Sequence, residues 1–362
     1  MDRLGTLTDA MQHRAKMIAA TQYLWLTAKF RGRPRAMAEE ARRERFASRD
    51  LEQVLLSAIA TGTTTSAGWA QELAPYGALT ATWCKSVTAK TVLGQLDFLR
   101  APFLTKTICD VTPGAASWVA EGQPIPMSSL SLTATDALEP KRVSALVPVT
   151  EELLQSWTPA VEANLSDLVS RVVRYTIDRS LLDPDSSVTA ARPASLTFGL
   201  TPTQSTGSSA AQALADIAAL LDVVLTDTQD TARVVIVMSP KTALHLSQLL
   251  TTGNTFAFPH LGARGGEIFG VPVIVSPAAG ALGSPAANVV AAIDAARIVV
   301  ADDGLMLAAA SDTASLSFTD APAGAESQVS LFQTGTSALR VTLFKNFVRA
   351  NSTAVAWFPT AY

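Results

Sequence analysis

Residues 117–182 constrain the fold most, because they join a β-prone arm of low charge to the pattern of one long helix. In the arm, Leu130 and Leu132 alternate with Ser and Thr, which predicts a strand with two different faces. Pro124 and Pro126 fix φ and lack backbone donors, so their segment belongs at a turn or an exposed edge. We therefore expect the arm to project from the body of the protein.

Residues 150–182 predict the long helix. Thr150 with Glu151 and Glu152 is a suitable helix start, since acidic side chains stabilise a helix N-terminus. Pro159 would kink the helix, so we expect a separate first turn, and the Asp-Pro-Asp sequence at 183–185 ends the helix. Apolar residues recur at three- and four-residue steps, which predicts a buried face of Leu153, Leu154, Trp157, Val161, Leu165, Leu168, Val172 and Ile177.

The chain has 362 residues, 48% hydrophobic and 16% charged, enough for one large or two medium domains with hydrophobic cores. This composition excludes a disordered or fibrous chain. Its apolar stretches are too short or too polar for a membrane span or a cleaved signal, so we expect synthesis in the cytosol and no membrane partner. Cys84 and Cys109 are too few for a disulfide framework and too isolated for a zinc site, which favours buried thiols, with an intersubunit disulfide as the alternative.

Residues 1–50 form a separate basic segment, whereas the remainder of the chain is acidic. Its arginines are suited to contact DNA phosphates without reading base sequence. A solvated helix face that mixes Glu39, Glu40 and Glu44 with arginine explains the pattern equally well. The candidate DNA-facing residues are Arg31, Arg33, Arg35, Arg42 and Arg43.

Residues 205–320 predict an α+β core. A helical pattern covers residues 214–225, and a second helix starts at Ser239 and Pro240. The apolar set of that second helix is Leu244, Leu246, Leu249 and Leu250. The predicted strands are those at 233–238, 270–276, 288–293 and 296–301, with residues 337–358 expected to complete a sheet.

The sequence contains little that suggests catalysis. His13, His245 and His260 lack metal-binding spacing, and no G-x-S-x-G elbow precedes a helix. The glycines of residues 262–266 lack the surroundings of a phosphate-binding loop and predict a mobile loop, while the Asp-Asp-Gly at 302–304 predicts a turn. We therefore predict no catalytic site, no cofactor and no metal site.

Several stretches, taken in order, carry a resemblance to a known family. They are residues 118–136 (starting Trp-Val-Ala-Glu-Gly), 147–182 (with Val-Thr-Glu-Glu-Leu-Leu), 268–274 (Ile-Phe-Gly-Val-Pro-Val-Ile), 294–300 and 339–358. They resemble the extended loop, the spine helix, an axial-domain strand and the closing strands of the major capsid proteins of tailed bacteriophages. This family has the fold first seen in phage Hong Kong 97, which encapsulins share.

The resemblance implies an α+β fold, the Hong Kong 97-like capsid fold. It also implies intersubunit contacts by the arm residues Trp118, Ile125, Met127, Leu130 and Leu132. The expected divisions are a basic N-terminal segment (1–53), an N-terminal arm (54–105) that is extended rather than packed, an extended loop (106–148), a peripheral domain with the long spine helix (149–204 and 325–350) and an axial domain (205–324 and 351–362).

Two departures from the family limit this resemblance. In the founding phage, a loop lysine bonds covalently to an asparagine of a neighbour, assisted by a glutamate. Here the lysine position falls on Ile125, residues 107–138 contain no lysine, and residues 340–343 (Arg-Val-Thr-Leu) lack the acid, so we predict no autocatalytic cross-links. Residues 1–50 are short for the scaffolding segment that a phage protease removes from some relatives, so they are either a reduced scaffold or a retained DNA-facing segment.

The implied function is that of a structural protein and not an enzyme. The chain is expected to form the pentamers and hexamers of an icosahedral head around double-stranded DNA, in a virion assembled in the bacterial cytoplasm. Portal, scaffold, protease and decoration proteins are the other expected partners. An encapsulin-like compartment, which would enclose protein and no nucleic acid, is the first alternative. An enzyme of unrecognised class, which would be a small soluble species with a ligand-filled pocket, is the second.

Overall fold

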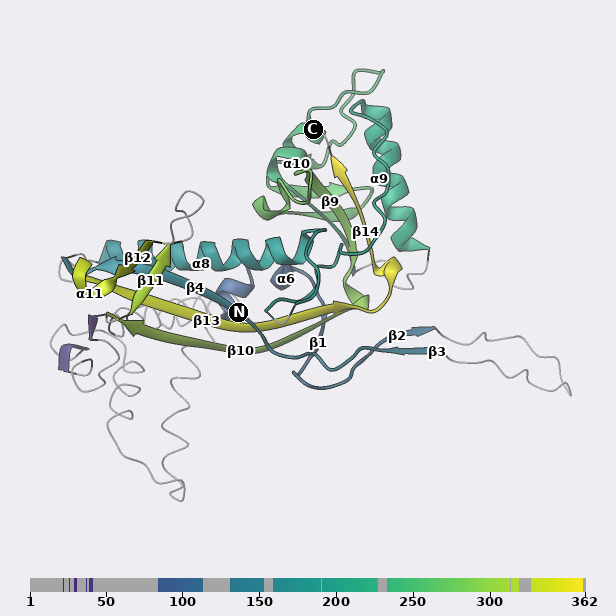
Figure 1. The fold of residues 1–362 in the computed structure, drawn as a ribbon. Helices are drawn as coiled ribbons and strands as arrows, with labels where there is room; N and C mark the ends of the chain where they lie inside the picture. The colour runs from purple at the N-terminus through teal and green to yellow at the C-terminus, as the bar shows by residue number, and fades with distance from the viewer. Residues whose placement is uncertain are drawn as a thin grey trace, which may run out of the picture. The chain divides into compact units, whose positions relative to one another are not determined.

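The computed structural model describes residues 84–112, 131–152, 159–189, 191–226, 233–312, 314–318 and 327–360, and a few positions between Gln22 and Ala41 (Figure 1). The chain forms two compact units. Unit 1 comprises Met1–Thr88, Val143–Val173 and Gly304–Phe344, and unit 2 comprises Ala89–Arg142, Arg174–Asp303 and Lys345–Tyr362. The chain passes between the units at Thr88–Ala89 and within four elements: β4 (Lys141–Thr150), α8 (Pro159–Leu182), β10 (Ile298–Ser311) and β13 (Thr336–Arg349).

Unit 2 is built on a six-stranded sheet with the order β14-β9-β5-β8-β7-β6. In this sheet β5 runs parallel to β8, and the other neighbouring strands are antiparallel. Helix α9 (Ala210–Leu225) packs against β14 and β9, and α10 (Pro240–Ser247) packs against β6. The strands are β5 (Val234–Met238), β6 (Leu261–Gly262), β7 (Gly265–Ile268), β8 (Val271–Val275), β9 (Asn288–Asp294) and β14 (Val355–Thr360).

The core of unit 2 follows from the periodicity of each element. Alternate residues of a strand point to the same face, and Val234, Ile236 and Met238 of β5 accordingly lie in one cluster with Ile217 and Leu220 of α9. All five residues of β5 are buried, so the sheet is covered on both faces at this strand. The buried strand predicted at residues 233–238 is therefore confirmed as β5.

Local hydrogen bonds set the helix starts. Ser209 accepts a hydrogen bond from the Gln212 backbone N–H, and the Gln212 side chain accepts one from the Ser209 N–H, which forms a capping box at α9. Ser239 caps α10 through the Thr242 N–H, with Pro240 in the first turn. Both predicted helices are confirmed, although α10 ends at Ser247, so Leu249 and Leu250 of its predicted apolar set lie outside it.

The rest of unit 2 includes α6 (Val92–Gln95), β1 (Leu99–Ala101), β2 (Ile108–Thr112) and β3 (Ser131–Ala134). β1 pairs in parallel with the start of β10, Leu99 opposite Val299. Ala101 and Leu138 pack with Val299 in a small second core. This part of the predicted arm is less extended than expected, because α6 is a helical turn with Val92 buried.

Unit 1 contains the continuations of β4, β10 and β13, strands of a sheet with the order β1-β10-β13-β4. The hydroxyls of Ser144 in β4 and Thr342 in β13 are 3.0 Å apart. A separate antiparallel pair joins β11 (Ser315–Phe318) to β12 (Ser327–Ser330), and α11 (Leu331–Thr334) follows. Residues 337–358 were expected to complete one sheet. They instead contribute to two sheets, with β13 in this one and β14 in the six-stranded sheet of unit 2.

Helix α8 ends at Leu182 as predicted, and its described part begins at Pro159, which is acceptable at a helix start. The predicted buried face is wrong in part. Leu168 and Val172 are 50% and 47% exposed, whereas Val169 and Val173 are almost fully buried. Apolar residues occupy both neighbouring stripes of this helix, so the period predicted a helix without fixing which stripe faces inward.

Two loop predictions are also wrong. Residues 302–304 lie inside β10, where Asp302 forms an ion pair with the buried Lys345 of β13. Residues 262–266 form the β6–β7 hairpin. This hairpin requires glycine at position 266, because a Cβ there would lie 2.0 Å from the His260 carbonyl oxygen. These glycines therefore allow two backbones to approach closely.

We predict that Phe358→Ala destabilises unit 2. Phe358 is 1% exposed in the core beneath α9, and removing a buried aromatic ring costs about 3–5 kcal/mol of unfolding free energy. Denaturant unfolding of unassembled subunits measures this loss. Phe256→Ala, at a residue that is 59% exposed, is the control and should change the unfolding free energy by less than about 0.5 kcal/mol. Equal effects of the two substitutions would contradict the core described here.

Candidate assembly surfaces

Strands β2 and β3 form a two-stranded sheet at the base of the predicted extended loop (Figure 1). Val111 lies opposite Leu132, and a register irregularity separates Ile108 from Asp110. An isolated two-stranded hairpin is marginally stable in water, so this one needs a packing partner. Leu132 is the candidate arm-contact residue that the structure places, and Trp118, Ile125, Met127 and Leu130 lie outside the described residues.

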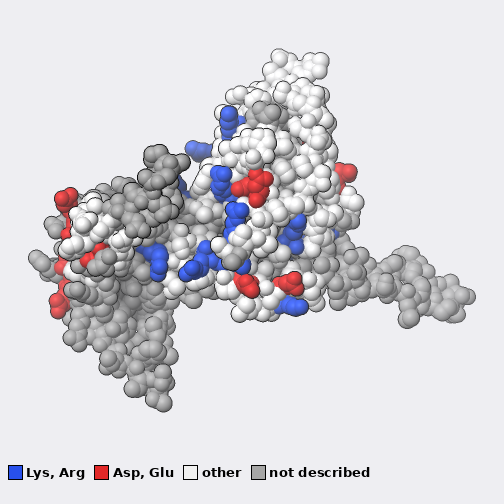
Figure 2. Space-filling view, viewed as in Figure 1, with Lys and Arg blue, Asp and Glu red and all other residues white. Residues whose placement is uncertain are grey.

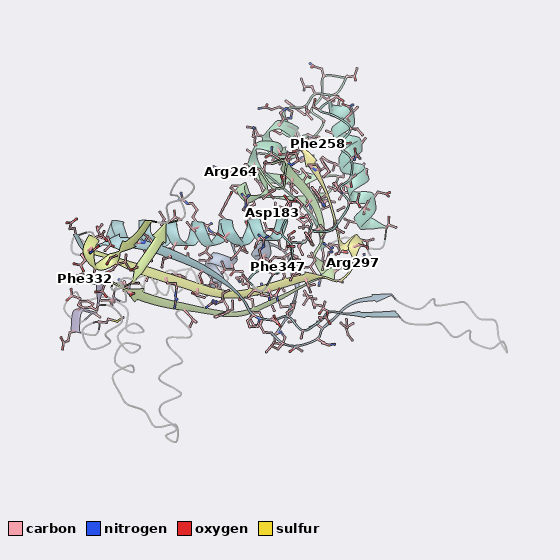
Figure 3. All side chains as sticks on the ribbon, in the orientation of Figure 1. Asp183, Phe258, Arg264, Arg297, Phe332 and Phe347 are labelled. Atoms are coloured by element: carbon pink, nitrogen blue, oxygen red, sulfur yellow. The ribbon has the colours of Figure 1, made fainter. Side chains whose placement is uncertain are left out.

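Both units leave large apolar side chains in solvent. In unit 1 the most exposed is Phe332 of α11, at 78%, which points away from the ribbon in Figure 3. Gly335, in the left-handed conformation at φ 56°, ends α11 and donates to the carbonyls of Leu331 and Phe332. Other exposed residues of the described chain include Leu104, Ile108, Leu146, Val188, Leu250, Phe256, Phe269 and Leu307. These residues are the candidates for burial against a partner, because apolar side chains gain free energy when they leave water.

The outward stripe of α8 is one of these surfaces. Leu168, Val172 and Tyr175 recur at helical spacing and are each more than two-fifths exposed. Arg171 forms an ion pair with Asp167, one turn earlier on the helix. Leu168 and Val172, which the sequence pattern assigned to the core, instead offer apolar surface next to charged side chains.

Asp178 is a buried carboxyl group that joins three segments of unit 2. It is 5% exposed on α8. One of its oxygens accepts a hydrogen bond of 2.9 Å from the Val92 N–H at the start of α6, and the other accepts one of 2.8 Å from the Ser276 hydroxyl after β8. Sequence reasoning missed this residue, although an acid between the core positions Ile177 and Leu181 is a visible signal.

Burial raises the pKa of Asp178 from 3.8 to about 6, because the ionised carboxylate loses contact with water. The hydrogen bonds from Ser276 and Val92 and the positive charge of Arg174 counteract this rise in part. The folded subunit therefore binds a proton at Asp178 more tightly than the unfolded chain does.

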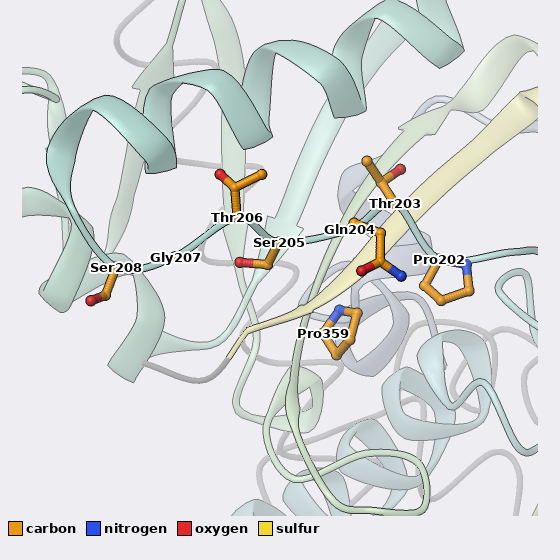
Figure 4. A pocket seen from close by; sticks show the side chains of 8 residues that line it. All are labelled: Pro202, Thr203, Gln204, Ser205, Thr206, Gly207, Ser208 and Pro359. Carbon is orange, nitrogen blue, oxygen red and sulfur yellow. The ribbon is translucent and has the colours of Figure 1, made fainter.

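Two cavities lined by described residues do not resemble catalytic sites. One, of about 530 Å³, is lined by residues 202–208 and Pro359 and has no ionisable side chain in its wall (Figure 4). The buried Asp216 holds that segment, accepting from the Ser205 and Thr206 hydroxyls at 3.0 and 2.7 Å. Asp216 is therefore occupied in fixing the loop before α9.

The second cavity, of about 390 Å³, is mostly apolar and contains Lys141 and Arg349 in its wall. Arg349 donates a hydrogen bond of 2.7 Å to the Leu196 carbonyl, and burial lowers the pKa of its guanidinium. Lys141 lies 3.2 Å from Glu139. These cations fix the chain segments around the cavity, and no histidine, cysteine or carboxyl group lines it.

Other candidate chemistry is also absent from the described part of the chain. It contains no cluster of three or more His, Cys, Asp or Glu side chains placed to hold a metal ion. No helix among the described residues is long and apolar enough to cross a membrane. His245 and His260 are exposed, and Cys84 is buried as predicted.

The candidate DNA-facing residues Arg31, Arg33, Arg35, Arg42 and Arg43 lie outside the described residues. In the same segment, Lys29 lies 2.6 Å from Glu40 and its ammonium lies 5.4 Å from the centre of the Phe30 ring. At least one basic side chain of this segment is therefore paired within the chain, and the role of the arginines stays a prediction.

Comparisons with known proteins agree on one family. A model described as the phage capsid family matches residues 104–348. The capsid polyprotein of Pseudomonas phage PAJU2 is 29% identical over 319 residues, which make up 84% of this chain and 47% of that protein. This chain thus spans about half the length of that curated relative.

Solved structures show the same fold at low sequence identity. One from Gordonia phage Cozz has a TM-score of 0.51 at 10% identity and covers 73% of this chain and 85% of its own. One from Mycobacterium phage Cain has a TM-score of 0.50 at 17% identity and covers 75% of this chain and 90% of its own.

The chain belongs to the phage capsid family, and its α+β fold is the Hong Kong 97-like fold of phage major capsid proteins. It is a structural protein of the virion. The predicted family and fold class are confirmed.

We predict that Asp178 makes the subunit less stable as the pH rises from about 4 to about 6. In this window the folded state keeps a proton that the unfolded state has released, so unfolding becomes easier with rising pH. Asp178→Asn removes this titration. Relative to wild type, the variant should gain roughly 2–3 kcal/mol of unfolding free energy between pH 4 and pH 7, as measured by denaturant unfolding of unassembled subunits. A difference between the two proteins that does not change with pH would show that Asp178 titrates normally.

Proposed function

We propose that this chain forms the pentamers and hexamers of an icosahedral phage head that encloses double-stranded DNA, without covalent cross-links between subunits. The observation that carries the proposal is the exposed apolar surface on both units, together with the two-stranded hairpin β2–β3, in a chain of the phage capsid family. Side chains such as Phe332 and Phe269 leave water only when another molecule covers them.

Ring formation explains why apolar surface is spread over several elements. A subunit in a ring meets its neighbours through two different surfaces, and such contacts produce a closed assembly when their rotation closes. Each contact can be weak, because many of them act together in a shell. Exposed residues on α8, β10, α11 and the β7–β8 turn fit this requirement better than one large patch would.

Assembly without covalent bonds is supported by the residues at the position of the family's assisting glutamate, where this chain has no carboxyl group. Arg340 is exposed, and the hydroxyl of the buried Thr342 lies within hydrogen-bonding distance of Ser144. No carboxyl group occurs among residues 340–343, and residues 107–138 contain no lysine. The division into peripheral and axial domains made from the sequence remains part of this proposal.

Further partners are proposed on the family relationship. A head of this kind requires a portal, and a scaffold, a protease or decoration proteins accompany some heads. Residues 1–50 are either removed during assembly or retained facing DNA, and the intact mass of the subunit in purified particles distinguishes these outcomes. Assembly is proposed to take place in the cytoplasm of the bacterial host.

Electron microscopy of the chain expressed alone, after size-exclusion chromatography, tests self-assembly. We expect closed shells, tubes or rings, and boiling them in SDS should yield a single band at 38.0 kDa, the mass of the chain, or below it if the N-terminus is removed. A ladder of covalent oligomers would overturn the absence of cross-linking. A uniform small species, with scaffold co-expressed, would overturn the capsid proposal, and shells filled with a protein and no nucleic acid would favour an encapsulin-like compartment.

Neutralising Arg31, Arg33 and Arg35 together tests the DNA-facing role. If these residues contact phosphate groups, their replacement by Gln lowers the amount of DNA per particle, because the contacts are electrostatic. Quantifying DNA against protein in purified particles measures the effect, with Arg171→Gln on α8 as a control that removes one positive charge at a paired surface arginine. Unchanged DNA content and particle yield would assign the arginines to a solvated helix face.

A further inference from the structure

The cavity of about 390 Å³ in unit 2 combines an apolar wall with positive charge. Phe198, Phe347 and Val188 contribute to the wall, and Lys141 and Arg349 carry the charge. Val188 is 66% exposed, so the wall reaches the surface of the unit. A cavity of about 150 Å³ holds benzene, so this one has room for an aromatic ring and a neighbouring polar group.

Arg349 is the member of this wall that most needs an explanation. It is partly buried, and burial lowers the pKa of its guanidinium. Within the described chain it donates one hydrogen bond, to the Leu196 carbonyl at 2.7 Å, and forms no ion pair with an acid. A guanidinium has several further N–H donors, whose geometry matches the two oxygens of a carboxylate. A carboxylate placed in the cavity would therefore meet both a donor group and a positive charge.

The β7–β8 turn holds an aromatic residue in a conformation that aromatic residues rarely adopt. Phe269 and Gly270 form the whole connection between the two strands, with φ of 52° and 78°. Such a turn favours Asn or Gly at its first position, because a left-handed backbone crowds a larger side chain. Phe269 is nevertheless 59% exposed. Core packing and turn geometry thus give no reason for phenylalanine here, whereas contact with another molecule does.

Glu267 gives this exposed ring an acidic neighbour. It is exposed on β7, two residues before Phe269. The other exposed aromatic residues of the described chain, Tyr175, Phe256 and Phe332, have no exposed acidic side chain within three sequence positions. On the visible face of unit 2, Lys and Arg occupy more of the surface than Asp and Glu do (Figure 2). An exposed ring beside an exposed acid is therefore a distinctive combination among the described residues.

The turn and the cavity are complementary in polarity and in charge. An aromatic ring gains free energy when it leaves water for an apolar wall, and a carboxylate beside it is attracted by cations. Both surfaces belong to unit 2 but consist of different residues, so one copy can offer its turn while it receives the turn of another. Contacts between two different surfaces of identical subunits produce rings when their rotation closes.

We propose that Phe269 of one copy inserts into the cavity of the next copy, with the Glu267 carboxylate facing Arg349 and Lys141. This inference rests on the proposed function as a ring-forming capsid subunit and specifies the partner of one surface: the β7–β8 turn of a second copy.

A pair of cysteines tests the contact. Val188→Cys places a thiol in the cavity wall, and Phe269→Cys places one on the turn. Under oxidation, assembled particles of the double variant should give a ladder of disulfide-linked oligomers in SDS without reductant, because each copy is joined to the next. The two single variants, which keep Cys84 and Cys109, are the controls and should remain monomeric.

A double-mutant cycle tests the ion pair. Glu267→Gln and Arg349→Gln should each raise the subunit concentration needed for assembly about tenfold, since both remove the same attraction. Together they should raise it about tenfold and not the roughly hundredfold of independent effects. Asp222→Asn, at an exposed acid of α9, is the control and should change it less than about twofold. Denaturant unfolding of unassembled subunits verifies that each variant is folded.

The outcomes separate this contact from the capsid function. If wild type assembles while the Val188→Cys and Phe269→Cys pair forms no ladder, the contact is refuted and the capsid function stands. Protection of Val188→Cys from maleimide in particles, without a ladder, would assign the cavity to a different partner. Independent effects of Glu267→Gln and Arg349→Gln would refute the ion pair. A wild-type chain that forms no rings or shells, even with scaffold, would instead remove the proposed function.

Discussion

The carboxyl group of Asp178 connects segments of unit 2 that are far apart in the sequence. It fixes the C-terminal half of α8 to the start of α6 and to the segment after β8. The apolar neighbours Ile177 and Leu181 supply burial on the same helix, while the two hydrogen bonds specify where the helix lies. A charge in this position is unfavourable, and the surrounding fold retains the acid because both of its oxygens have donors. The placement of the helix against this part of the chain depends on that arrangement.

A second constraint concerns the apolar side chains that the folded subunit leaves exposed at its surface. Polar groups beside two cavities of unit 2 have structural explanations, since Asp216 and Arg349 fix nearby chain segments. Apolar side chains are left in water on α8, α11 and the β7–β8 turn. A protein whose function is to contact copies of itself requires that distribution, since its specificity comes from the shape and polarity of many small areas.

The sequence predicted the elements of unit 2 well and the orientation of side chains less well. The strand at β5 and the start of α10 were clear because burial on both faces and the Ser239–Pro240 cap leave local signals, whereas α9 begins at Ala210, before the predicted start at residue 214. The phase of α8 was not, because Leu168 and Val169 are both apolar and only packing decides which one faces inward. The Asp302 turn prediction was wrong for a similar reason: the acid lies in a strand because Lys345, far along the chain, neutralises it.

The candidate site was predicted mainly through family resemblance. Leu132 lies in β3 as expected, but the exposure of Phe332 and the hydrogen bonds of Asp178 follow from tertiary packing that no local pattern contains.

The passage of the chain between its two units through β4, α8, β10 and β13 has a mechanical consequence. A joint made of one flexible loop swivels freely, whereas hydrogen-bonded strands and a helix bend only by small dihedral changes shared over many residues. Four such elements therefore restrict the dihedral changes available where the chain passes between the units more than a single loop would.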